Sequence, residues 1–230
     1  MGCERVMGAM MDESRSRHPP LVSQGETALV LEFPNKMARI LLLAMEEVLG
    51  KTGLNAILNL ARLPHFIDHY PPADFTGGVA FGQISDLLGA VDEMYGPRGG
   101  HMLALRTGRA CFKHSIRDFG ALVGLGDLLF RLLPARMRTR LALEVVVEIF
   151  NRYSDQVLSL QQEEGVFLLA VERCGVCWER TTTYPACALL EGLLQEALYW
   201  INGGRLFDIE EVACRAMGAP TCTFRIEKMS

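Results

Sequence analysis

Three side chains near the carboxy terminus of this 230-residue chain have the types and spacing of metal ligands. Glu211, Cys214 and Cys222 lie in a short run of otherwise apolar sequence that is typical of two β-strands. A carboxylate on the apolar face of a strand has to be neutralised, paired or coordinated, because an unpaired buried charge is costly. Cys187 begins a predicted helix, where free amides favour a thiolate, and is the natural fourth ligand.

Three thiolates and one carboxylate match the ligand preference of Zn²⁺, and four protein ligands leave no open position on the metal. The predicted zinc site is therefore structural, and we assign no catalytic residues. The alternative interpretation is that these cysteines are small buried hydrophobic residues. Cys174 and Cys177 form a single CxxC pair, which fits a redox pair, half of a second metal site, or ligands that compete with Cys187.

The composition narrows the class of protein. Half of the residues are hydrophobic, enough for a full core, and the net charge of -4 argues against general affinity for nucleic acid. Charged residues interrupt every long apolar run, so we expect no membrane-spanning helix. The amino terminus has no secretion-signal core, and five of the seven cysteines lie between Cys174 and Cys222. We therefore expect a cytoplasmic protein whose cysteines bind metal or are buried.

One segment departs from this acidic balance. Residues 98–140 contain nine Lys or Arg and two Asp, a net charge of +7, whereas the remaining residues sum to -11. A solvated helical face with partners elsewhere in the fold is the simpler interpretation, and recognition of an anionic ligand or an acidic protein surface is the alternative.

The hydrophobic periodicity predicts a fold of the α+β class, with several helices packed on a four-stranded antiparallel sheet. Helices are expected first, and then strand, strand, helix, strand, strand, with strands at 156–162, 166–173, 205–213 and 221–228 and a helix at 187–202. Residues 1–25 are expected to be a mobile arm and residues 26–155 a helical half. Residues 156–230 are the expected zinc-stapled core, and 26–230 together form one domain.

The helix at 187–202 and the following run EEVACRAMGAPTCTF resemble the 4-vinyl reductase domain, a small-molecule-binding family named after a protein of bacteriochlorophyll synthesis. In phenol-responsive regulators with this domain, the zinc ligands are a Cys, then Glu-x-x-Cys, then a further Cys after seven residues. That pattern corresponds to Cys187, Glu211, Cys214 and Cys222. The family fold resembles heme-based nitric-oxide sensors and small vesicle-tethering subunits, and it is commonly dimeric. The Tyr-x-Ser-x-Arg signature of the heme sensors is missing here.

The resemblance implies a zinc-containing protein that holds a hydrophobic small molecule, for example a tetrapyrrole or an aromatic compound, as a sensor, carrier or chaperone. It also implies a homodimer. Two alternatives stay open: a bacteriochlorophyll 4-vinyl reductase or its accessory subunit, and a dimeric interaction scaffold. The sequence contains no dinucleotide or phosphate-binding fingerprint, so a reductase would need a partner to supply electrons.

Overall fold

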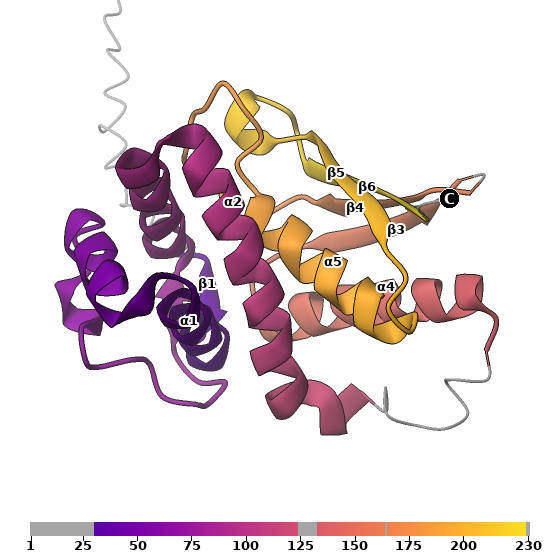
Figure 1. Ribbon diagram of the computed structural model, residues 1–230, viewed down its shortest axis with the longest axis horizontal. Coiled ribbons are helices and arrows are strands. Elements are labelled where there is room, and N and C mark those ends of the chain that lie inside the picture. The colour runs from indigo at the N-terminus through magenta and orange to yellow at the C-terminus, as the bar shows by residue number, and fades with distance from the viewer. Residues whose placement is uncertain (1–29, 124–132, 164, 229–230) are drawn as a thin grey trace, which may run out of the picture.

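A computed structural model describes residues 30–123, 133–163 and 165–228, and Figure 1 shows their arrangement. The elements in chain order are β1 (Glu32–Pro34), α1 (Asn35–Leu60), η1 (Pro64–Phe66), β2 (Gly78–Ala80), α2 (Phe81–Val123), α4 (Ala135–Tyr153), β3 (Leu158–Gln162), β4 (Phe167–Val171), α5 (Ala188–Ile201), β5 (Phe207–Ala213), η2 (Arg215–Met217) and β6 (Cys222–Lys228). The predicted arm at residues 1–25 lies outside the described residues.

The main sheet has four strands in the order β3-β4-β6-β5, and every neighbouring pair is antiparallel. This confirms the predicted fold class. Strand β6 lies inside the sheet, and its residues Cys222, Phe224 and Ile226 are fully buried on one face. Because side chains alternate along a strand, these three share the face that packs on the helices. A second sheet, which was not predicted, pairs the short strands β1 and β2.

Two helices are longer than the sequence predicted because each continues through a glycine kink. Gly50 in α1 and Gly96 in α2 both have φ of 72° and extended ψ, so the chain bends there and the helix resumes at once. A loop was expected at residues 96–100. Instead, Pro97 follows the kink directly, at the first turn of the resumed helix, where its missing N–H costs no hydrogen bond.

Helices α2 and α5 pack with direct backbone contact. A Cβ atom at Gly192 would lie 2.0 Å from the carbonyl oxygen of Leu105, and one at Gly108 would lie 2.0 Å from that of Leu189. Figure 1 shows α5 beside the second half of α2, with the sheet beyond it. The two glycines therefore set how closely α2 approaches the layer formed by α5 and the sheet.

One continuous hydrophobic core joins the helical half to the sheet, from Leu31 and Phe33 to Phe224 and Ile226. Within the described residues, no helix is long and apolar enough to cross a membrane. A partly buried ion pair between Arg180 and Asp92, with Nη2 and Oδ2 2.5 Å apart, ties the loop before α5 to α2.

Candidate functional site

Six potential metal ligands converge where β4, β5 and β6 meet the start of α5. They form two overlapping groups of four, within each of which all ligand atoms lie within 4.8 Å of one another. One group is the predicted set, Cys187, Glu211, Cys214 and Cys222. The other combines Cys187 and Cys222 with Cys174 and Cys177. All six residues are buried, and Cys187 and Cys222 belong to both groups.

A β-bulge brings Glu211 and Cys214 to the same side of β5. The register of β5 against β6 shifts between Glu211 and Ala213, and the 3-10 helix η2 begins directly after Cys214. A spacing of three residues would place two side chains on opposite faces of a regular strand. The bulge removes that alternation, as bulges do when they redirect a side chain.

Glu211 is held by the start of α5 but keeps one unpaired oxygen. Cys187 is the N-cap residue of α5, and its backbone N–H donates to Oε2 of Glu211 over 2.8 Å. The other oxygen, Oε1, is buried without a hydrogen-bond partner among the described residues. Burial, together with the nearby Cys214, raises the pKa of Glu211 to about 8. A buried carboxylate with an unpaired oxygen is the environment that a cation would complete.

The sulfur atoms are close enough to bind one ion. The Sγ–Sγ distances are 3.5 Å for Cys174 to Cys187, 3.4 Å for Cys177 to Cys222 and 3.6 Å for Cys187 to Cys222. Zn–S bonds of about 2.3 Å in a tetrahedron separate two sulfurs by about 3.8 Å. The observed distances are slightly shorter than that edge, so small side-chain movements would admit Zn²⁺.

Two features favour the thiolate form in this cluster. The backbone N–H of Arg215 donates to Sγ of Cys222 over 3.3 Å. Hydrogen bonds from the thiols of Cys174 and Cys187, and from two further cysteines, lower the pKa of Cys177. The thiolate is the form that ligates a metal.

The structure gives the CxxC pair a place that the sequence left open. Cys174 and Cys177 lie in the loop after β4, and a Cβ atom at Gly175 between them would lie 2.4 Å from the ring of Phe33. This loop is therefore pressed against the core beside β1, and both thiols face the cluster. Their short separation in sequence was visible, but only the sheet topology brings them to Cys187 and Cys222.

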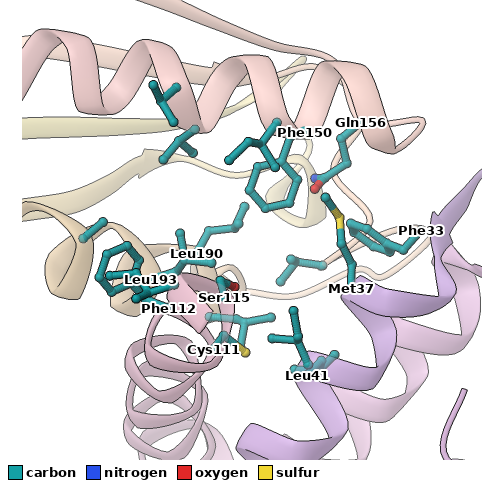
Figure 2. A pocket seen from close by; sticks show the side chains of 18 of the residues that line it. Phe33, Met37, Leu41, Cys111, Phe112, Ser115, Phe150, Gln156, Leu190 and Leu193 are labelled. Carbon is teal, nitrogen blue, oxygen red and sulfur yellow. The ribbon is translucent and has the colours of Figure 1, made fainter. Parts of the chain in front are cut away.

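An apolar pocket of about 140 Å³ lies beside the cluster, among α1, α2, α4 and α5. Figure 2 shows side chains from all these helices around it. The described residues that line it are Phe33, Met37, Ala38, Ile40, Leu41, Ile84, Cys111, Phe112, Ser115, Ile116, Ala142, Val145, Val146, Ile149, Phe150, Gln156, Val176, Leu189, Leu190, Leu193, Ala197 and Ile201. Most come from the helical half, and the sequence analysis assigned none of them to a site.

The pocket wall carries no charge among the described residues. Its one ionisable group is the thiol of Cys111, whose pKa is raised by burial to about 12, so that it stays neutral. Gln156 and Ser115 supply the polar side chains, and the remaining lining residues are aliphatic, aromatic or Met. Such a wall suits an uncharged, largely apolar molecule.

The cluster and the pocket share parts of the same two segments. Val176, which lines the pocket, lies between Cys174 and Cys177, and Leu189 and Leu190 follow Cys187 closely in α5. A metal ion that fixed these cysteines would also fix one wall of the pocket.

The basic segment is largely explained by partners within the fold. Arg109 donates to Oε1 of Gln195, Lys113 lies 3.8 Å from Glu196, and Arg140 pairs with Glu144 one helical turn away. These contacts agree with the simpler interpretation, a solvated helical face.

Comparison with solved structures identifies the same fold in H-NOX proteins, which are nitric-oxide sensor domains. The Fe(II) unliganded H-NOX protein from K. algicida matches with a TM-score of 0.56 and 12% identity, over 86% of this chain and 97% of that chain. A mutant H-NOX protein from S. oneidensis in the Fe(II) state matches with a TM-score of 0.51 and 15% identity, over 84% and 96%. At these identities the similarity establishes the fold alone.

No curated protein matches this sequence. A family model does match, that of the 4-vinyl reductase domain, and it covers residues 168–228. The matched range begins within β4, includes α5 and the bulged strand β5, and ends with β6. It contains all six residues of the cysteine and glutamate cluster. The carboxy-terminal part of this chain therefore belongs to the 4-vinyl reductase domain family.

Proposed function

We propose that this protein binds a small hydrophobic molecule in the pocket between its helices and acts as a sensor, carrier or chaperone for it. The apolar pocket carries the proposal. It is lined from four helices and three loop or strand segments, and its wall is uncharged among the described residues. Pockets of this kind bury most of an apolar ligand and need few polar groups to orient it.

The volume favours a single aromatic ring over a tetrapyrrole. An engineered cavity of about 150 Å³ in another protein binds benzene. The pocket here, at about 140 Å³, has nearly that size. A tetrapyrrole has several times the volume of benzene and would require α1 and α4 to move apart.

Calorimetric titration of the full chain with toluene and with protoporphyrin tests this preference. Toluene is expected to bind with one molecule per chain and with a negative heat-capacity change, because apolar surface is buried. Binding of protoporphyrin but not of toluene would reverse the choice of ligand class. Failure of both would contradict the function.

We further propose that the cluster holds a structural zinc ion through Cys187, Glu211, Cys214 and Cys222. The unpaired Oε1 of Glu211 supports this set, because coordination would satisfy it. The competing set uses Cys174 and Cys177 in place of Glu211 and Cys214. Four protein ligands in either set would leave the metal closed to substrate.

Metal analysis of matched single variants distinguishes the two sets. If the proposed ligands are correct, Cys214→Ala loses zinc, whereas Cys174→Ala retains one equivalent. The reverse pattern would assign the metal to the CxxC set. Two equivalents in the wild type, each lost with one variant, would mean that both sets are filled with Cys187 and Cys222 bridging.

A role in bacteriochlorophyll synthesis, as a 4-vinyl reductase or its accessory, is the second candidate, and the family match favours it. Comparing divinyl pigment reduction in the presence and absence of the protein tests it. Unchanged pigment composition after deletion would count against it. The homodimer and the interaction scaffold also stay predictions, and the mass in solution by light scattering tests the dimer.

A further inference from the structure

The pocket contains one polar group that the described fold leaves without a partner. Gln156 lies in the turn between α4 and β3 and is only 2% exposed. Both its side-chain oxygen and its side-chain nitrogen lack a hydrogen-bond partner among the described residues. Figure 2 shows the amide turned into the pocket, between Phe150 and Met37.

An unpaired amide is an unusual feature of a buried site. Each buried donor or acceptor without a partner costs about 1–3 kcal/mol. A side chain of similar length without polar atoms, such as Met, would avoid that cost in an otherwise apolar wall. The amide is therefore better explained by what it binds than by how it packs.

The turn that carries Gln156 is fixed by hydrogen bonds to β1. The backbone N–H of Glu32 donates to Oδ2 of Asp155 over 2.8 Å, and the N–H of Asp155 donates to the carbonyl oxygen of Glu32 over 3.2 Å. The N–H of Gln156 itself donates to Oγ of Ser154. These contacts hold the backbone at Gln156 in place before a ligand arrives, which lowers the entropic cost of binding.

The chemistry of the amide defines its partner. A primary amide presents an acceptor and a donor side by side, and the partner that satisfies both has an adjacent donor and acceptor of its own. Carboxamides, lactams and protonated carboxylic acids have that arrangement. A carboxylic acid is ionised at neutral pH, and the described wall offers no cation to pair with it.

We propose that the pocket is specific for a neutral, ring-sized molecule that carries a carboxamide or lactam group, and that Gln156 recognises this group through two parallel hydrogen bonds. The inference rests on the proposed function and adds the polar half of the ligand to its apolar half. Gln156 is thereby a specificity-determining residue of the pocket.

Binding of four probes to the full chain at pH 7.5 tests the proposal. Toluene supplies the ring alone, benzamide adds the amide, phenol adds a single hydroxyl, and benzoate adds a charge. The variants are Gln156→Met and Gln156→Leu, and Gln161→Met on the exposed edge of β3 is the matched control. Thermal melting of each variant checks that it folds, and Gln156→Met is expected to melt no lower than the wild type.

The expected result is a change in preference. Two hydrogen bonds of about 1 kcal/mol each correspond to about 30-fold in affinity, so Gln156→Met should weaken benzamide binding by about 10- to 100-fold. It should leave toluene binding unchanged or tighter, whereas Gln161→Met changes neither. In the wild type, benzamide should bind more tightly than phenol, and benzoate should bind least.

Two outcomes would overturn the inference, and they differ in what else they affect. If toluene binds but the ratio of benzamide to toluene affinity is the same in the wild type and Gln156→Met, then Gln156 does not select the ligand and the pocket remains a binding site. If none of the four probes binds the wild type, the proposed function fails together with this inference.

Discussion

The cysteine cluster and the apolar pocket lie side by side but are built in opposite ways. All six residues of the cluster come from residues 174–222, a single stretch that the 4-vinyl reductase family model covers. The pocket takes its wall from α1, α2, α4 and α5 together with the segments at Phe33, Gln156 and Val176. The first is a compact local feature, and the second exists only because the helical half packs on the sheet.

This difference separates what holds the molecule together from what it recognises. The cluster offers a carboxylate and five thiols in a buried space, a set that binds metal and leaves little room for anything else. The pocket offers volume and a single unpaired amide. Val176, Leu189 and Leu190 connect them, so the metal would act on the ligand only through the position of one wall.

The largest effect is expected from removing a ligand that both metal sets share. Cys222→Ala should abolish zinc binding and lower the free energy of unfolding by at least about 3 kcal/mol, because it leaves buried anionic partners without a cation. Metal analysis and denaturant unfolding measure this. Cys111→Ala is the matched control, since Cys111 is a buried cysteine outside the cluster, and it should keep its zinc. Full zinc content in Cys222→Ala would exclude both ligand sets.

A large effect is also expected at the contact between α2 and α5, which both regions use. Gly192→Ala places a methyl group against the carbonyl oxygen of Leu105, so the helices must separate, at a cost of about 2–3 kcal/mol. Gly82→Ala is the control, because nothing lies within 4 Å of a Cβ atom there. It should be neutral or slightly stabilising in chemical denaturation. Equal stability of the two variants would mean that this backbone contact is not tight.

Filling the pocket should separate the two regions. Ala197 is buried in α5 and lines the pocket, so Ala197→Leu should occupy part of the cavity and weaken toluene binding by at least about tenfold. The zinc content should not change, because Ala197 is not part of the cluster. Loss of zinc together with ligand binding would instead mean that the pocket and the cluster form one unit.

The smallest effect is expected from a carboxyl group on α5, the helix that joins the two regions. Burial raises the pKa of Glu191 from 4.5 to about 7, although nearby Arg109 opposes the shift. Its contribution to stability is therefore complete below about pH 4.5 and is lost as the pH rises through 7. Solvent screening of this partly exposed group reduces the expected loss to about 1 kcal/mol.

Unfolding of the wild type and of Glu191→Gln at a series of pH values measures this contribution. The difference between the two proteins should change between about pH 5 and 8 in the direction that disfavours the wild type at high pH. Parallel stability curves over this range would mean that the pKa of Glu191 is ordinary in the folded protein.

Several features of the cluster could be predicted from sequence because short-range patterns encode them. Alternation along 207–213 placed Ile209 and Glu211 on one buried face, and the periodicity of 187–202 placed Cys187 at the start of a helix. The burial of Cys222 with Phe224 and Ile226 followed from the same period of two. The sheet and its antiparallel pairing were predicted for the same reason, whereas the continuation of α1 and α2 through Gly50 and Gly96 was not.

The sequence by itself thus determined that a carboxylate and several thiols would share a buried space at the end of a four-stranded α+β fold. Only the tertiary structure decided that Cys174 and Cys177 join them, since that depends on where β4 ends relative to β6. Only it placed Gln156 in an apolar pocket, because a glutamine after a helix carries no local signal of burial. Local patterns fix which face of an element is apolar, and long-range packing fixes which faces meet.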